Sequence, residues 1–135
     1  MMIPDAFMLL IMVFMHVIAD YNLQGILAQM KQISWWKDNY PDGDNSNDYV
    51  MALFMHSFAW AFLIMLPIVA YMMYLGVFND TIWVDAICCL FALNLMVHML
   101  IDHAKANCKI INLVVDQVAH LLQIALTWAA LSLTF

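Results

Sequence analysis

The chain contains no arginine, and its basic side chains other than histidine are four lysines. With a formal net charge of −6 it lacks the clustered positive charge that binding to nucleic acid requires, which excludes that class of partner. Cysteine is scarce: Cys88, Cys89 and Cys108 form no Cys-x-x-Cys pair, so we expect neither a disulfide framework nor a thiolate metal site. Charged residues make up only 10% of the 135 residues, whereas 67% are hydrophobic. A soluble domain of this length cannot bury so much apolar surface.

Four long apolar stretches account for most of the chain. They cover residues 6–28, 49–78, 81–104 and 110–135, and each is near or above the roughly 20 residues that a helix needs to cross a bilayer. We interpret the first as a span rather than a signal peptide, because no lysine precedes Lys31 and both His16 and Asp20 lie inside it. The sequence therefore predicts an all-α membrane protein, with residues 1–135 forming a single four-transmembrane-helix bundle.

The connections between the predicted spans indicate the topology. A polar loop at residues 37–48 links the first two spans, and the other two connections are short, so consecutive helices should be antiparallel neighbours. All four lysines lie in the first and third connections. The positive-inside rule places these connections in the cytoplasm and both termini on the non-cytoplasmic side. We therefore expect a multi-pass protein of the cell's inner (plasma) membrane, surrounded by membrane lipid.

Polar residues recur at helical spacing inside the predicted spans. His16, Asp20 and Gln24 follow one another at intervals of four, which places them on one helix face. The second span contributes His56. The third and fourth spans each carry a similar polar stripe, made of Asn94, His98, Asp102 and Lys105, and of Asn112, Asp116, His120 and Gln123.

The ionisable groups of these stripes share one depth in the membrane. With a rise of ~1.5 Å per residue, four of them lie roughly 9–12 Å from the cytoplasmic ends of their helices, namely Asp20, His56, His98 and Asp116. The others lie within about one to two turns of that level, namely His16, Asp102 and His120. Ionisable residues inside spans are costly and normally mark a function. The sequence therefore predicts one buried cluster near the cytoplasmic leaflet.

Imidazole and carboxylate groups without thiolate are typical ligands of Zn²⁺, Mn²⁺ or Fe²⁺. A cation also offsets the cost of burying several carboxylates together. We therefore expect a divalent transition metal as cofactor, zinc first with manganese or iron as alternatives, and one or two ions. The candidate metal ligands are His16, Asp20, His56, His98, Asp102, Asp116 and His120. The alternative without a metal is a set of interhelical hydrogen bonds.

The order of these motifs resembles a family of small phage and bacterial inner-membrane proteins of unknown function. The resemblance covers almost the whole chain and rests on His-x3-Asp-x3-Gln, a lone His early in the second span, His-x3-Asp-x2-Lys and Asp-Gln-x2-His, which begin at His16, His56, His98 and Asp116. That family is distantly similar to proteins proposed to be membrane-bound metal-dependent hydrolases. The acidic first loop and the absence of arginine depart from its typical members.

These observations lead to the hypothesis that the cluster activates water to hydrolyse a lipid-linked or phosphate-containing substrate. Asp116 and His120 are the candidate catalytic acid–base groups, and Lys105 is the candidate to hold a phosphate or headgroup oxygen. One alternative is translocation of metal ions or protons along buried His and Asp side chains. Another is a non-enzymatic phage accessory protein that acts on a host membrane protein, with a structural metal. Whether the chain is an enzyme or forms a homo-oligomer stays open.

Overall fold

The computed structural model describes residues 5–43, 45, 47–77 and 81–132. Within this part of the chain every regular element is helical, which confirms the all-α prediction. The elements are α1 (Asp5–Val17), η1 (Ile18–Asn22), α2 (Leu27–Met30), α3 (Ile33–Asn39), α4 (Asp48–Tyr74), α5 (Thr81–Ala106) and α6 (Leu113–Ser132). All are α-helices except η1, which is a π-helix.

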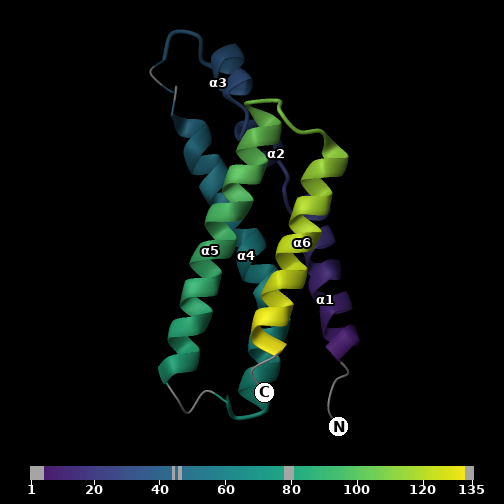
Figure 1. Cartoon of the computed structure of the whole chain (residues 1–135). Coiled ribbons are helices and arrows are strands. Elements are labelled where there is room, and N and C mark those ends of the chain that lie inside the picture. Colours follow the sequence, from purple (N-terminus) through teal and green to yellow (C-terminus); the bar gives the residue numbers. More distant parts are fainter. Residues whose placement is uncertain (1–4, 44, 46, 78–80, 133–135) are drawn as a thin grey trace.

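The long helices α1, α4, α5 and α6 form a bundle in which α4 contacts each of the other three (Figure 1). Successive long helices run in opposite directions, as the short connections predict. The start of α1, the turn after α4 and the end of α6 lie together at what we call the terminal end. The opposite end carries α2, α3, the last turn of α5 and the α5–α6 connection, and we call it the lysine end because Lys31, Lys37, Lys105 and Lys109 lie there.

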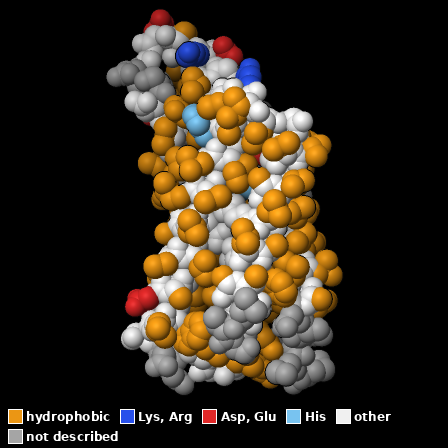
Figure 2. All heavy atoms as spheres, in the orientation of Figure 1, with side chains coloured by type: hydrophobic (Ala, Val, Ile, Leu, Met, Phe, Trp, Pro, Cys, Tyr) orange, Lys and Arg blue, Asp and Glu red, His pale blue; other side chains and the backbone are white. Residues whose placement is uncertain are grey.

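The surface of the bundle is apolar over most of its length. Leu10, Leu93 and Leu126 are 60%, 59% and 71% exposed. Figure 2 shows hydrophobic side chains spread over the helical body, with most of the visible charged side chains gathered at the lysine end. The helices α4, α5 and α6 are each long and apolar enough to cross a membrane, whereas the first apolar helix, Ala6–Asn22, is shorter. These features indicate a membrane protein.

The first helix departs from the prediction of one continuous span to Ala28. It changes to π-helix at Ile18, where the Leu23 N–H donates to the Ile18 carbonyl at 2.9 Å, and then breaks before α2 begins. Gly25 in this break has a φ of +50°, a conformation that favours glycine. The Gln24 side chain donates to the Asp20 carbonyl at 3.0 Å, so it competes with the backbone for a helical acceptor.

The other predicted boundaries lie within a few residues of the observed ones. The helix α4 begins one residue before the predicted Tyr49, α5 continues two residues past Ala104, and α6 begins three residues after Ile110. The predicted loop at 37–48 is partly helical, because α3 extends to Asn39. The helix α4 ends at Tyr74, four residues before the predicted end at Phe78, and the predicted end at Phe135 lies outside the described residues.

The terminal half of the bundle has an apolar core with one polar contact between α5 and α6. Large side chains with at most 1% exposure fill this core, including Met12, Ile64, Ile68, Met72, Ile124 and Leu131. Asn94 donates to the Thr127 hydroxyl at 2.9 Å and accepts from the Gln123 amide at 2.9 Å. Gln123 also donates to the Asn94 carbonyl at 2.7 Å. The polar stripes of the two helices therefore face each other and hold α5 against α6.

Replacing Asn94 with Ala should destabilise the bundle, because Gln123 and Thr127 lose buried hydrogen-bond partners. We expect the free energy of unfolding in detergent micelles to fall by about 1–3 kcal/mol, measured by denaturant titration. The matched control is Asn39→Ala on the exposed end of α3, which should change stability by about 0.5 kcal/mol or less. Equal losses in the two variants would show that the contact does not stabilise the bundle.

Candidate metal centre

The four long segments of the bundle bring the predicted ionisable side chains together toward the lysine end. They come from α1 and η1 (His16, Asp20), α4 (His56), α5 (His98, Asp102) and α6 (Asp116, His120). The cluster is deeply buried: the His98, Asp116 and His120 residues are 0% exposed, and the side chain of Asp20 is 6% exposed. The predicted convergence of these side chains is therefore present in the structure.

Asp20, His56 and His98 form one group that could hold a metal ion. His56 Nε2 lies 3.2 Å from His98 Nε2 and 3.4 Å from Asp20 Oδ1, and the third side of the triangle, from His98 Nε2 to Asp20 Oδ1, is 3.9 Å. Asp20 Oδ1 is buried and has no hydrogen-bond partner among the described residues. Two imidazole nitrogens and a carboxylate oxygen therefore face one point.

Asp102 lies beside this group of three, with a second carboxylate oxygen that also accepts from Lys31. Its Oδ2 lies 3.3 Å from His56 Nε2 and 3.7 Å from His98 Nε2. Ligands bound about 2.0–2.1 Å from a tetrahedral zinc lie about 3.4 Å from one another. The distances from His56 and His98 to each other and to the two carboxylates, 3.2 to 3.9 Å, are close to that value. The donor set and its spacing therefore fit a zinc-like ion.

A second group that could hold a metal consists of His98, Asp102 and His120. His98 belongs to both groups, and its two ring nitrogens face in different directions: Nε2 toward His56 at 3.2 Å, and Nδ1 toward His120 Nδ1 at 3.1 Å. An ion bound at His98 Nε2 leaves Nδ1 to hydrogen-bond with His120. The arrangement therefore suits one ion at Asp20, His56 and His98. His120 then orients the His98 ring through a hydrogen bond to its Nδ1.

His16 and Asp116, both predicted as ligands, lie outside the two groups. Trp60 Nε1 donates to His16 Nδ1 at 2.8 Å, so the proton of a neutral His16 must be on Nε2, 3.2 Å from the Gln117 carbonyl oxygen. This tautomer has no lone pair left for a metal. Asp116 Oδ1 lies 3.6 Å from His120 Nε2, and its Oδ2 accepts from Lys105 at 2.7 Å.

Two residues that the sequence analysis assigned neither as ligands nor as catalytic groups also position the site. Gln117 donates to Asp20 Oδ2 at 3.3 Å and to Asp116 Oδ2 at 3.0 Å, so one amide links two carboxylates. Trp60 is fully buried, and its ring stacks on His98 with centroids 4.1 Å apart. Trp60 therefore separates the polar cluster from the apolar core of the terminal half.

Lys31 is the third residue that the sequence analysis did not place in the site. It is only 7% exposed, and its Nζ lies 2.7 Å from Asp102 Oδ2. Asn107 fixes the backbone that follows it, by donating to the Lys31 carbonyl at 3.0 Å and accepting from the Ile33 N–H at 2.8 Å. Lys31 and Lys105 thus neutralise Asp102 and Asp116, whereas no lysine pairs with Asp20 among the described residues.

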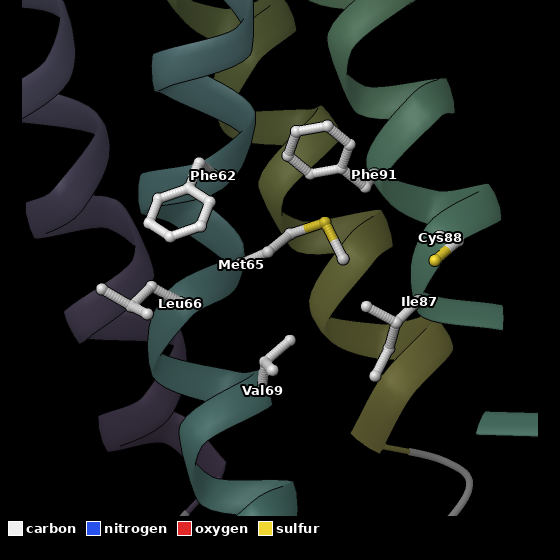
Figure 3. A pocket seen from close by; sticks show the side chains of 7 residues that line it. All are labelled: Phe62, Met65, Leu66, Val69, Ile87, Cys88 and Phe91. Atoms are coloured by element: carbon white, nitrogen blue, oxygen red, sulfur yellow. The ribbon is translucent and has the colours of Figure 1, made fainter. Parts of the chain in front are cut away.

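A pocket of about 440 Å³ connects the cluster with the surface at the lysine end. Its lining includes Asp20 and Asp102 together with Lys31, Lys105 and Lys109. A second pocket, of about 270 Å³, lies between α4 and α5 on the terminal side of the cluster (Figure 3). Its lining from Phe62 to Phe91 contains no charged side chain. The cluster is therefore approached from the lysine end.

Comparisons of the chain with protein-family models, curated proteins and solved structures gave no match. The resemblance stated above therefore stays a prediction, and the geometry of the cluster carries the functional argument.

His98→Ala should abolish metal binding, because His98 belongs to both candidate ligand groups. Purified wild-type protein should carry about one equivalent of a divalent transition metal by elemental analysis, and the variant about a tenth of that or less. The control is His103→Ala, which removes an imidazole five residues further along α5, where His103 stacks on Tyr49. Metal retained by the His98 variant, or lost equally from both, would contradict this assignment.

Proposed function

We propose that this chain is a four-span inner-membrane protein that binds a divalent metal, zinc first, and hydrolyses a lipid-linked or phosphate-containing substrate at the cytoplasmic leaflet. One observation carries the proposal: the unpartnered oxygen of Asp20 faces His56 and His98, and Asp20 also lines the lysine-bearing pocket. Three protein ligands with room for one more group are typical of catalytic rather than structural zinc sites.

The proposed topology follows from the lysines. All four lie at one end of the bundle, so the positive-inside rule favours a cytoplasmic lysine end and non-cytoplasmic termini. The helix from Ala6 to Asn22 extends roughly 25 Å, and α2 and α3 complete the first crossing in this proposal. Trp35 and Trp36 on α3 then lie at the depth where interfacial aromatic side chains are common.

The ion, when bound, lowers the pKa of water and so supplies a nucleophile near neutral pH. The side chains around it offer a route for the released proton. Asp102 Oδ2 lies beside His56 and His98, and its carboxylate can accept the proton. Asp102 Oδ1 lies 3.8 Å from His120 Nε2, which in turn lies 3.6 Å from Asp116 Oδ1. Asp116 accepts from Lys105, whose side chain is 32% exposed and lines the pocket. His120 and Asp116 therefore hold and pass protons in the proposed reaction, and Lys105 connects them to solvent.

Asp116→Asn tests the catalytic role separately from metal binding, because Asp116 lies outside the candidate ligand groups. The variant should keep its metal, while its rate on chromogenic phosphate mono- and diesters falls by about 10²–10⁴-fold. The matched control, Asp85→Asn on the exposed start of α5, should keep the wild-type rate.

Two results would contradict the enzyme proposal. If metal-loaded wild-type protein hydrolyses neither ester class, the metal serves the fold and the accessory function gains support. If Asp116→Asn loses metal and folding together, a catalytic role for Asp116 has no support, and His120→Gln then tests proton transfer with metal content measured alongside the rate.

A second function, proton relay, is favoured by one observation. The ring nitrogens of His56, His98 and His120 form a chain with steps of 3.2 and 3.1 Å. A complete path needs polar groups on the terminal side of the cluster. The described buried polar side chains there are neutral, as at Asn94 and Thr127, and the core around them is apolar. Proton flux into liposomes that disappears in His98→Ala would support this function over hydrolysis.

A further inference from the structure

The lysine-end pocket has a charge pattern that selects its ligand. Three carboxylates supply negative charge: Asp20 and Asp102 line the pocket, and Asp116 forms an ion pair with Lys105, which also lines it. Lys31, Lys105 and Lys109 also line it and supply three positive charges. With neutral histidines the formal charges cancel. A divalent ion at Asp20, His56 and His98 leaves the pocket with a formal charge of +2, which complements a ligand with two negative charges.

Lys109 is the lysine best placed to bind such a ligand. Lys31 and Lys105 are 2.7 Å from carboxylates, whereas no ion pair of Lys109 is found in the described part of the chain. Lys109 lies after the end of α5 and has a φ of +56°. Glycine is the usual residue in this conformation after a helix, so a lysine here adds a side chain that most such turns lack. Its ammonium is therefore available to an anion in the pocket.

The pocket also reaches the apolar surface of the bundle. Tyr21 and Leu113 contribute to its lining, and they are 59% and 54% exposed. Tyr21 lies in η1, just before the break in the first helix, where Leu23 and Ile26 are 60% and 62% exposed. A ligand with its anionic group among the lysines can therefore place an apolar chain against this surface without leaving the membrane.

We propose that the pocket binds the phosphate monoester headgroup of a membrane lipid, with the acyl chains lying against Tyr21, Leu113 and the break in the first helix. This inference rests on the proposed function and names its substrate class. A phosphate monoester carries close to two negative charges near neutral pH, as the loaded pocket requires. In the reaction, water oxygen bonds to phosphorus, the bond from phosphorus to the lipid oxygen breaks, and a proton passes to the lipid alcohol.

Calorimetric titration of the zinc-loaded protein in detergent micelles tests the inference with three probes. Short-chain phosphatidic acid has both the phosphate monoester and the acyl chains, glycerol phosphate lacks the chains, and short-chain phosphatidylcholine lacks the monoester. Phosphatidic acid should bind at least about tenfold more tightly than either of the others, since each lacks one of the two recognised parts. Glycerol phosphate binding as tightly as phosphatidic acid would overturn the lipid proposal in favour of a soluble ligand.

Lys109→Gln should weaken phosphatidic acid binding by about tenfold, because one charge-assisted hydrogen bond to phosphate is lost. Its metal content should stay unchanged, since Lys109 is not a candidate ligand. The matched control is Lys37→Gln on α3, which removes the same charge outside this pocket and should bind as wild type does. Equal affinity in the Lys109 variant and wild type would overturn the assignment of Lys109.

The outcomes separate this inference from the proposed function. If the protein carries metal and hydrolyses phosphate esters but does not prefer phosphatidic acid, only the lipid inference fails. If the purified protein carries no metal, the proposed function fails, and titration of this metal-free protein still measures the preference of the lysines for the phosphate monoester.

Discussion

The cost of burying three carboxylates inside an apolar bundle determines how its lysine end is built. Asp102 is compensated by Lys31 and Asp116 by Lys105, each at 2.7 Å. Asp20 has only neutral donors and imidazoles around it, and one of its oxygens has no hydrogen-bond partner. An unpaired buried carboxylate is strongly unfavourable, so Asp20 must either be protonated or face a positive charge between itself and the two histidines. A protonated histidine or a bound cation meets this requirement, and a cation also uses both imidazole lone pairs.

Most of the helical fold follows from hydrophobic pattern alone, because a long apolar segment has few stable alternatives to a helix. The helices α4, α5 and α6 therefore agree with the prediction to within a few residues. The first helix does not, since its break depends on local competition that hydropathy does not report. Gln24 bonds to the Asp20 carbonyl, and Gly25 adopts a positive φ. The π-helix that holds Asp20 has the same local origin, and such turns often occur at functional sites.

The spacing of four residues correctly predicts which helix faces meet, because it repeats almost once per helical turn. It does not predict which atoms remain available. His16 lies on the predicted face, but Trp60 and Gln117 occupy both of its ring nitrogens. Trp60 lies among apolar residues, and Gln117, although part of the Asp-Gln-x2-His motif, is rotated about 100° from Asp116, so helical spacing alone assigns neither side chain to the site. Lys31 is missed because the predicted first span ends at residue 28 and leaves Lys31 in the connection, whereas in the structure its Nζ lies 2.7 Å from Asp102 Oδ2.

The two halves of the bundle differ in a way that bears on how the cluster works. Toward the lysine end, a pocket with three lysines reaches Asp20 and Asp102. Toward the terminal end, Trp60 covers the cluster, and the core behind it is built from side chains such as Met12, Ile64 and Ile68. A transported ion or proton would have to cross that apolar layer, where desolvation is costly. A reaction at the cluster needs access from one side only, and the pocket supplies it. The asymmetry therefore supports the proposed reaction at the lysine end over passage through the membrane.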